Sequence, residues 1–260
     1  MKLCLWNGQD EDWTECCGKT LHKKGRVKMR WVNIKAVFGK QMKETLKNKE
    51  VLIQFMMFPL LAVIMENLIH IEGMPAHYFT NLFSAMYVGM APLIATVAIL
   101  AEEKEKGTLR VLLMANVKPG EYLTGVGIYV WSACMLGSCV FVLTGGYRGS
   151  EAFFFLVTMG IGILISMVLG AAIGAMSRNQ MSATAVSVPM MLVLAFLPML
   201  AAFNETIEKA ARFVYTQQIS LLVGRASEKA VNAQNVGILA INVFLVFVFF
   251  LYAYRKSELD

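Results

Sequence analysis

The sequence predicts an all-α polytopic membrane protein with six transmembrane helices. Of the 260 residues, 57% are hydrophobic and only 16% are charged, and the mean hydropathy is +0.56. Soluble proteins carry about 25% charged residues. The second observation is a series of long apolar runs, because a helix needs about 20 apolar residues to cross a bilayer. Together these observations exclude a disordered chain and argue against an ordinary cytosolic enzyme.

The first 49 residues divide into two parts. Residues 1–28 lack hydrophobic periodicity, and we expect either a disordered extension or an upstream start with Met29 as the natural initiator. Residues 27–49 are too charged to span a membrane, yet their apolar residues recur at helical spacing. One stripe holds Val27, Trp31, Ile34, Phe38, Met42 and Leu46. The pattern predicts an amphipathic helix on the membrane surface; a plain solvated charge run is the alternative.

Six apolar runs follow, and together with the surface helix they make residues 29–260 one predicted transmembrane domain. The predicted spans lie near 51–69, 81–101, 122–143, 153–176, 181–203 and 235–254. Only four residues, Ser177 to Gln180, separate the fourth and fifth runs, so this pair should form a tight antiparallel hairpin. The loop 204–234 has helix-forming composition with scattered apolar residues, which predicts one or two short helices that cap the outer end.

The distribution of basic residues predicts the orientation. Half of the 24 Lys and Arg residues lie within the first 49 residues. With the N-terminus inside, only five fall on the outer side, namely Arg148, Lys209, Arg212, Arg225 and Lys229. Cytoplasmic loops carry the excess of Lys and Arg, so both termini are predicted to be cytoplasmic. The net charge of +6 then reflects anchors facing anionic lipid rather than affinity for nucleic acid.

Few residues could carry chemistry within the spans. Glu66 and His70 form an i,i+4 pair at the outer end of the first span and are weak candidates for metal or proton chemistry. The alternative is a polar rim at the water interface. The cysteines lack zinc-ligand spacing, and we expect no metal site and no catalytic residue.

Nucleotide binding by this chain is also not expected. Gly18-Lys19-Thr20 ends like a phosphate-binding loop, but Trp13 stands where the motif requires glycine. Any dependence on ATP must therefore come from another polypeptide, and the chain itself needs no cofactor.

Small residues recur every four positions along the fourth span. They are Gly162, Ser166, Gly170 and Gly174. This spacing places them on one helix stripe and permits close approach of a neighbouring helix. The pattern does not indicate whether that neighbour belongs to the same chain or to a second copy.

The most specific signal follows the second span, in the stretch AEEKEKGTLRVLLMANVKPGEYL at residues 101–123. A charged helix end leads into Gly107-Thr108, a short helix with Leu109, Leu112 and Leu113 on one side, and a Pro-Gly turn. The stretch resembles the E-K-x-x-G-T-L-x-x-L-L signature of the permease subunits of ABC transporters of the type-2 exporter class. The surface helix, six spans and outer loop are similar to that family's architecture over about residues 29–260.

The resemblance implies that residues 27–49 form the family's elbow helix and that residues 102–120 form a cytoplasmic coupling segment. By resemblance, the contact with a separate ATP-binding subunit, or its geometry, is carried by Glu102, Glu103, Glu105, Gly107, Thr108, Leu109, Leu112 and Leu113. ATP and Mg would then belong to that partner. Two permease copies, identical or paralogous, would form the translocation path of an exporter in the bacterial cytoplasmic membrane.

Three other functions stay open at this point. An integral membrane enzyme acting on lipid would need an acid, base or metal cluster, but the spans contain no Asp. An ion-coupled secondary transporter would need a central carboxylate or an internal repeat, and neither is evident. A non-transporting sensor or immunity subunit with the same fold is the third alternative. The substrate is not indicated by the residues.

Overall fold

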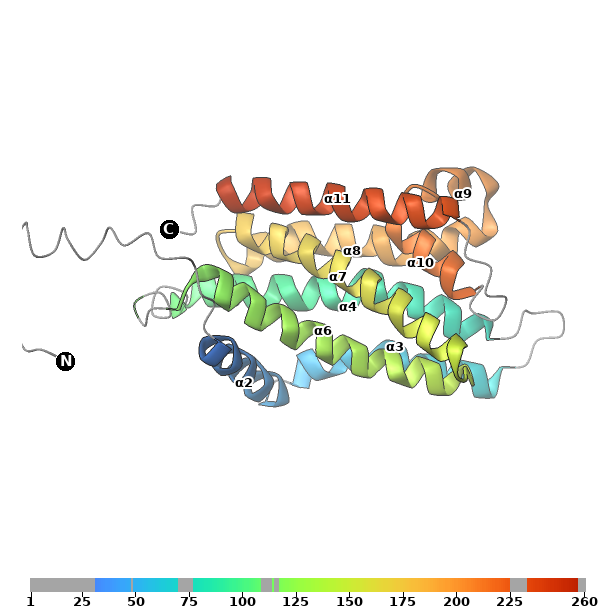
Figure 1. The fold of residues 1–260 in the computed structure, drawn as a ribbon, viewed down its shortest axis with the longest axis horizontal. Helices are drawn as coiled ribbons and strands as arrows, with labels where there is room; N and C mark the ends of the chain where they lie inside the picture. Colours follow the sequence, from blue (N-terminus) through green and yellow to red (C-terminus); the bar gives the residue numbers. More distant parts are fainter. Residues whose placement is uncertain are drawn as a thin grey trace, which may run out of the picture. The chain divides into compact units, whose positions relative to one another are not determined.

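The computed structural model describes residues 31–47, 49–69, 77–108, 114, 117–224 and 233–256. Of the two units into which the chain divides, Val32–Asp260 contains the helix bundle (Figure 1). The prediction of a disordered extension over residues 1–28 concerns residues outside the described part.

The described part of the chain is helical and contains no strand. The two N-terminal helices are α2, Trp31–Lys47, and α3, Lys49–Leu68. The long helices that follow are α4 (Tyr78–Glu105), α6 (Pro119–Thr144), α7 (Ser150–Met176) and α8 (Gln180–Phe203). The predicted outer loop forms two short helices, α9 (Glu205–Ala211) and α10 (Tyr215–Gly224), before the last helix, α11 (Ala233–Lys256).

Five described helices are long and apolar enough to cross a membrane: α4, α6, α7, α8 and the part Gln234–Lys256 of α11. The predicted first span, 51–69, is helical as α3, and among the residues whose side chains the structure describes it contributes a shorter apolar stretch, Leu52–Leu68. The chain is therefore a multi-helix membrane protein, and the sixth span stays a prediction.

Helix α4 forms the centre of the bundle. It packs against α3, α6, α7, α8 and α10, and most of its apolar side chains are buried. Gly89 permits the contact with α8, because a Cβ at this position would lie 2.9 Å from the Leu194 carbonyl oxygen. Helix α11, in contrast, exposes most of its large apolar side chains. Such exposure suits a helix that faces lipid.

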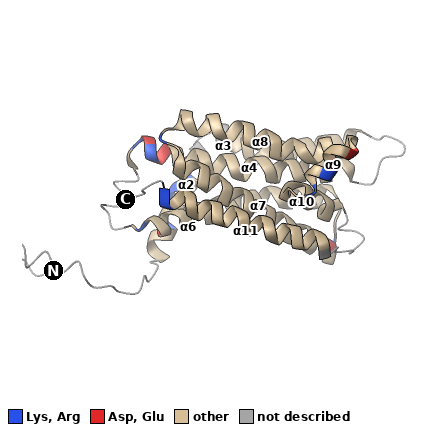
Figure 2. Ribbon diagram, turned by 90° about the horizontal axis from the view of Figure 1, so that it is seen from above, with Lys and Arg blue, Asp and Glu red and all other residues tan. Residues whose placement is uncertain are grey.

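Charged residues gather at the two ends of the bundle, and Figure 2 shows the uncharged middle between them. One end holds α2, the C-terminal ends of α4, α7 and α11, and the N-terminal ends of α6 and α8. We call it the α2 end. The opposite end holds α9 and α10. Because charged side chains are costly within hydrocarbon, this distribution agrees with helices that cross a bilayer.

The loop predicted as an outer cap is more buried than a surface cap would be. Helix α10 packs against α4, α7, α8 and α11, and Thr216, Gln217 and Gln218 are all buried within it. The sequence indicated helical propensity in this loop, but three consecutive polar residues gave no signal of burial.

Candidate functional site

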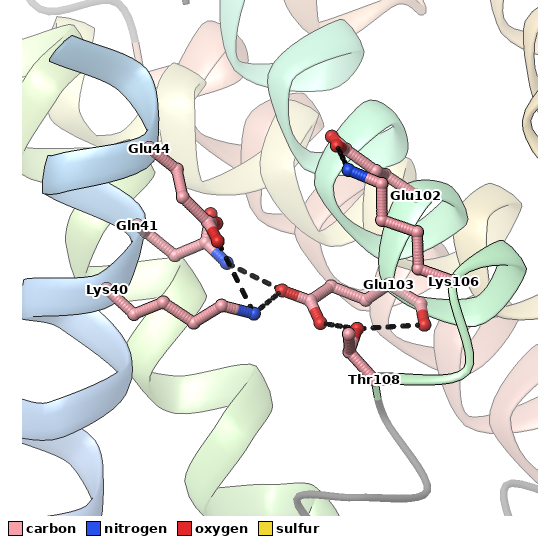
Figure 3. Close-up of polar contacts among 7 residues, drawn as sticks. All are labelled: Lys40, Gln41, Glu44, Glu102, Glu103, Lys106 and Thr108. Carbon is pink, nitrogen blue, oxygen red and sulfur yellow. Dashed lines mark hydrogen bonds and ion pairs between the residues drawn. The ribbon is translucent and has the colours of Figure 1, made fainter. Parts of the chain in front are cut away.

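Residues 102–107 at the charged C-terminal end of α4, which we call the α4 turn, are arranged around the buried carboxylate of Glu103. Glu103 is 5% exposed, and one of its oxygens accepts hydrogen bonds from Lys40 Nζ and from Gln41 Nε2, the latter at 3.2 Å. Its other oxygen accepts a hydrogen bond from the Thr108 hydroxyl. Figure 3 shows these contacts between α2 and α4. Glu103 therefore links α2 to the first residue after the α4 turn.

Helix α2 is held in this position by apolar contacts as well. Ile34 and Val37 are buried, and Phe38 makes an edge-on ring contact with Tyr129 of α6, with centroids 5.9 Å apart. Gly125 of α6 permits the close approach, because a Cβ there would lie 2.8 Å from the Val37 Cβ. The packing of α2 against the bundle thus positions the residues of α2 that contact Glu103, and α4 positions Glu103 itself.

Glu102 and Lys106 lie on the solvent side of the same turn. They form an i,i+4 ion pair with side-chain exposures of 43% and 63%. The hydrogen bond and the charge of Glu102 raise the pKa of Lys106. Exposed pairs of this kind contribute little to stability, so these two side chains are free to contact another protein.

Lys104 and Glu105 connect α4 to the turn between α7 and α8. Lys104 Nζ donates to the carbonyl oxygens of Ala175 and Ser177, the latter at 3.1 Å. Glu105 accepts a hydrogen bond of 2.8 Å from the backbone N–H of Gln180. Both contacts satisfy backbone groups that helix ends leave unpaired. The positive charge of Lys104 lies at the C-terminal end of α7 and the negative charge of Glu105 at the N-terminal end of α8, as the helix dipoles favour. The α4 turn is therefore attached to three other helices.

Gly107 ends α4 with a left-handed backbone conformation. Its φ is +66°, and its N–H donates to the Lys104 carbonyl at 3.1 Å. A Cβ at this position would meet nothing within 4 Å, so the backbone conformation rather than space favours glycine. Leu109, Leu112 and Leu113, which the resemblance assigns to the coupling contact, lie outside the described residues. Met114 is described and is 80% exposed.

Glu121 is a second buried carboxylate that the sequence reasoning missed. It is 1% exposed, accepts a 2.6 Å hydrogen bond from Asn33 of α2, and accepts another from the Lys118 backbone N–H at 3.2 Å. Pro119 begins α6, so Glu121 stands at the third position, where Glu commonly caps a helix. Its position in the helix was therefore the sequence signal for Glu121 as a cap. The burial of Gln41 had a weaker sequence signal, since Gln41 stands beside the apolar stripe of α2.

The small residues of α7 face α4 of the same chain. A Cβ at Gly162 would lie 2.7 Å from Val88 Cγ1, at Gly170 2.6 Å from the Leu93 carbonyl oxygen, and at Gly174 2.9 Å from Leu100 Cβ. The Ser166 hydroxyl donates to the Val88 carbonyl at 2.5 Å and lies 2.8 Å from the Tyr215 hydroxyl. The stripe therefore brings α7 into backbone contact with the central helix.

Glu66 has a structural role at the opposite end of the bundle. It accepts hydrogen bonds from the Thr80 backbone N–H at 3.0 Å and from the Thr80 hydroxyl at 3.2 Å, which caps the start of α4. His77 Nδ1 lies 3.6 Å from Glu66. Burial and the charge of Glu66 raise the pKa of nearby Tyr147 to about 12.

Glu66 belongs to no metal cluster within the described part of the chain. His70, its predicted partner, lies outside that part. In the ranges that the structure describes, no three His, Cys, Asp or Glu side chains group so as to hold a metal ion. The observed contacts of Glu66 favour the alternative interpretation, in which Glu66 belongs to a polar rim at the water interface.

The model of a family described as ABC-2 family transporter protein matches residues 69–252, which is more than half of the chain. The matched region begins after α3 and ends within α11, so it includes the whole α4 turn. No curated protein matches the chain.

Proposed function

The chain belongs to the ABC-2 family of transporter proteins, and from this premise we propose that it is the permease subunit of an ATP-driven exporter. Membership of the family identifies a transport subunit in the membrane rather than an ATPase, and it implies association with an ABC ATP-binding subunit. The single observation that carries the proposal is the family match across five apolar helices. ATP and Mg would be bound by the partner.

In this proposal α3 is the first of six spans and both termini are cytoplasmic. Helix α3 packs against α4 and α6 and is itself 20 residues long, which is enough to reach across the hydrocarbon core. Most of the Lys and Arg residues in the described part of the chain lie at the α2 end, which favours placing this end on the cytoplasmic side. Helix α2 then corresponds to the elbow helix.

We further infer that two permease copies surround the translocation path. Helices α8 and α11 expose many large apolar side chains, among them Val193 and Phe244. A second copy could cover part of this surface, as lipid could cover the rest.

The coupling step is assigned to the α4 turn and the segment 102–120. Glu102, Glu105 and Lys106 are accessible there, whereas Glu103 is occupied by contacts within the chain. A partner that moves the segment would therefore act on α2 through Glu103 and on the α7–α8 turn through Lys104 and Glu105. Such coupling requires that the partner bind two conformations of the bundle with different affinity.

The test is co-purification of the tagged chain from its host in mild detergent, followed by identification and quantification of bound proteins. The variant Leu109→Glu places a charge on the apolar side of the predicted coupling helix. Leu143→Glu is the matched control, because Leu143 is 80% exposed at the far end of α6 and the substitution is chemically the same.

We expect a stoichiometric ATP-binding subunit with the unmodified chain and with Leu143→Glu, and loss of that subunit with Leu109→Glu. If the unmodified chain purifies without an ATP-binding subunit, the exporter proposal is wrong. If Leu109→Glu retains the subunit as the control does, the exporter proposal stands but the coupling contact lies elsewhere.

A further inference from the structure

An apolar cavity at the α2 end is not part of the coupling site. It has a volume of about 350 Å³ and is lined by residues of α4, α6, α7 and α11. Its floor includes Thr96 and Leu100 of α4, which are buried, whereas Ile128 and Leu164 at its rim are 40% and 44% exposed. The cavity is therefore a groove that opens on the apolar surface of the bundle.

The polar groups that line the groove are all occupied by backbone carbonyls. The Thr96 hydroxyl donates to Pro92 at 2.7 Å, and the Thr124 hydroxyl donates to Gly120 at 2.7 Å. The Trp131 indole N–H donates to Gly160 at 3.3 Å. The groove thus offers no unpaired donor that would favour a polar ligand, and an alkyl chain is the ligand chemistry that it fits.

Basic residues stand at the ends of the two helices that flank the groove. Lys118 directly precedes α6, and Arg255 and Lys256 end α11. Thr124 and Phe250, both of which line the groove, are six residues away from Lys118 and Lys256, or about 9 Å along a helix. A molecule with an alkyl chain in the groove would therefore place an attached anionic group near these cations.

We propose that the groove binds one acyl chain of an anionic phospholipid, whose headgroup lies against Lys118, Arg255 and Lys256. The lining supplies the apolar contact, and the helix ends supply the charge complementarity. This site does not require that the protein transport anything, so it stands independently of the exporter proposal. In the orientation proposed above, the lipid belongs to the cytoplasmic leaflet.

Gly127 of α6 allows the groove to be filled by substitution. A Cβ at Gly127 would lie 3.5 Å from the Met167 methyl carbon, which is an ordinary contact, so the remainder of a leucine side chain would occupy the groove. Gly237→Leu is the matched control: Gly237 lies in α11 outside the lining, and a Cβ there meets nothing within 4 Å.

The experiment uses the full chain, purified in mild detergent with any partner that it retains. The protein is incubated with equal amounts of dioleoyl phosphatidylglycerol and dioleoyl phosphatidylcholine, and native mass spectrometry counts the phospholipids bound per chain. Variants Gly127→Leu and Gly237→Leu test the groove. The triple variant Lys118→Gln/Arg255→Gln/Lys256→Gln tests the headgroup contact.

We expect one retained phosphatidylglycerol with the unmodified chain and with Gly237→Leu, and loss of it with Gly127→Leu. The charge variant should retain a lipid but bind the two headgroups about equally. Equal lipid retention by Gly127→Leu and Gly237→Leu would overturn the groove as the site. Retained preference for phosphatidylglycerol in the charge variant would overturn the headgroup assignment. A change in the dimer fraction alone would show that a second copy, and not a lipid, occupies the groove.

Discussion

Glu103 carries a charge into a nearly closed environment at the end of a membrane helix. A buried carboxylate is costly unless it is paired and hydrogen-bonded. Lys40 supplies the opposite charge, and Gln41 and Thr108 supply neutral donors. Removal of the charge should therefore weaken the attachment of α2 to α4 without altering an outward contact surface.

We predict that Glu103→Gln lowers the free energy of unfolding by about 1–3 kcal/mol, the range for breaking a hydrogen bond to a buried charged group. Glu102→Gln is the matched control one residue earlier, and its exposed ion pair predicts a change of about 0.5 kcal/mol or less. Thermal unfolding of both variants in the same detergent provides the measurement. Equal effects of the two substitutions would contradict the special role of Glu103.

Gly170 is the residue of the α7 stripe with the least space. A Cβ there would lie 2.6 Å from the Leu93 carbonyl oxygen and 3.2 Å from Thr96 Cβ. We predict that Gly170→Ala destabilises the chain by about 1–3 kcal/mol, because the two helices must separate. Gly237→Ala in α11 meets no atom within 4 Å and should be neutral or slightly stabilising, since alanine favours helix. Comparison of the two unfolding temperatures checks the prediction.

At the scale of elements, Gly107 determines how α4 ends. Its φ of +66° costs other residues about 1–2 kcal/mol, although asparagine tolerates it better than alanine does. We therefore predict that Gly107→Ala is more destabilising than Gly107→Asn, despite the smaller side chain. Unfolding temperatures of the two variants test this order. The reverse order would indicate that space, and not backbone conformation, selects glycine.

The orientation of α2 differs from what its apolar stripe alone would give. Ile34 and Phe38 of the stripe contact the bundle, but Gln41 and Thr45 are buried beside them while Trp31 and Leu46 are exposed. The packed face is thus turned away from the centre of the stripe. Glu103 and Glu121 explain the offset, because each draws a polar residue of α2 towards the bundle. Trp31 and Leu46 are left for the membrane surface.

We predict that Gly125→Leu separates α2 from α6, because even a Cβ at Gly125 would lie 2.8 Å from the Val37 Cβ. The expected result is faster hydrogen exchange of the α2 amides with unchanged exchange in α7. Gly120→Leu serves as control in the same helix, since a Cβ there meets nothing within 4 Å. Unchanged exchange of α2 in Gly125→Leu would show that α2 does not depend on this contact.

At the scale of the whole molecule, the number of spans decides where the two ends of the chain lie. Six spans place both termini on one side, and five place them on opposite sides. We predict that epitope tags at the N-terminus and at the C-terminus are both protected from protease in right-side-out vesicles. A tag inserted after Arg148, in the turn between α6 and α7, should be cleaved. Protection of only one terminal tag would show that α3 does not cross.

The family match confirmed the resemblance that residues 101–123 indicate. This resemblance was predictable from the sequence, because a short motif of glycine and charged residues is specific in its residue types and their spacing. Helical content and the long apolar helices were also predictable, since bilayer thickness imposes their length. The sixth span stays a prediction, because the described apolar stretch of α3, Leu52–Leu68, is shorter than those of the other five helices. The cap formed by Glu121 at the start of α6 has a sequence signal. The contacts of Glu103 and Glu121 with α2 were not predictable, since their partners stand more than 60 residues away in the chain.

The sequence by itself determined that this chain is a helical membrane protein of a transporter family, because composition and local motifs are properties of neighbouring residues. The tertiary structure alone decided which charges at the α2 end face outward and which are held inside. Glu102 and Glu103 are adjacent in sequence and chemically identical, yet one is exposed and the other is buried. Consecutive residues on a helix point about 100° apart, so the packing of α2 against one side of α4 separates their environments.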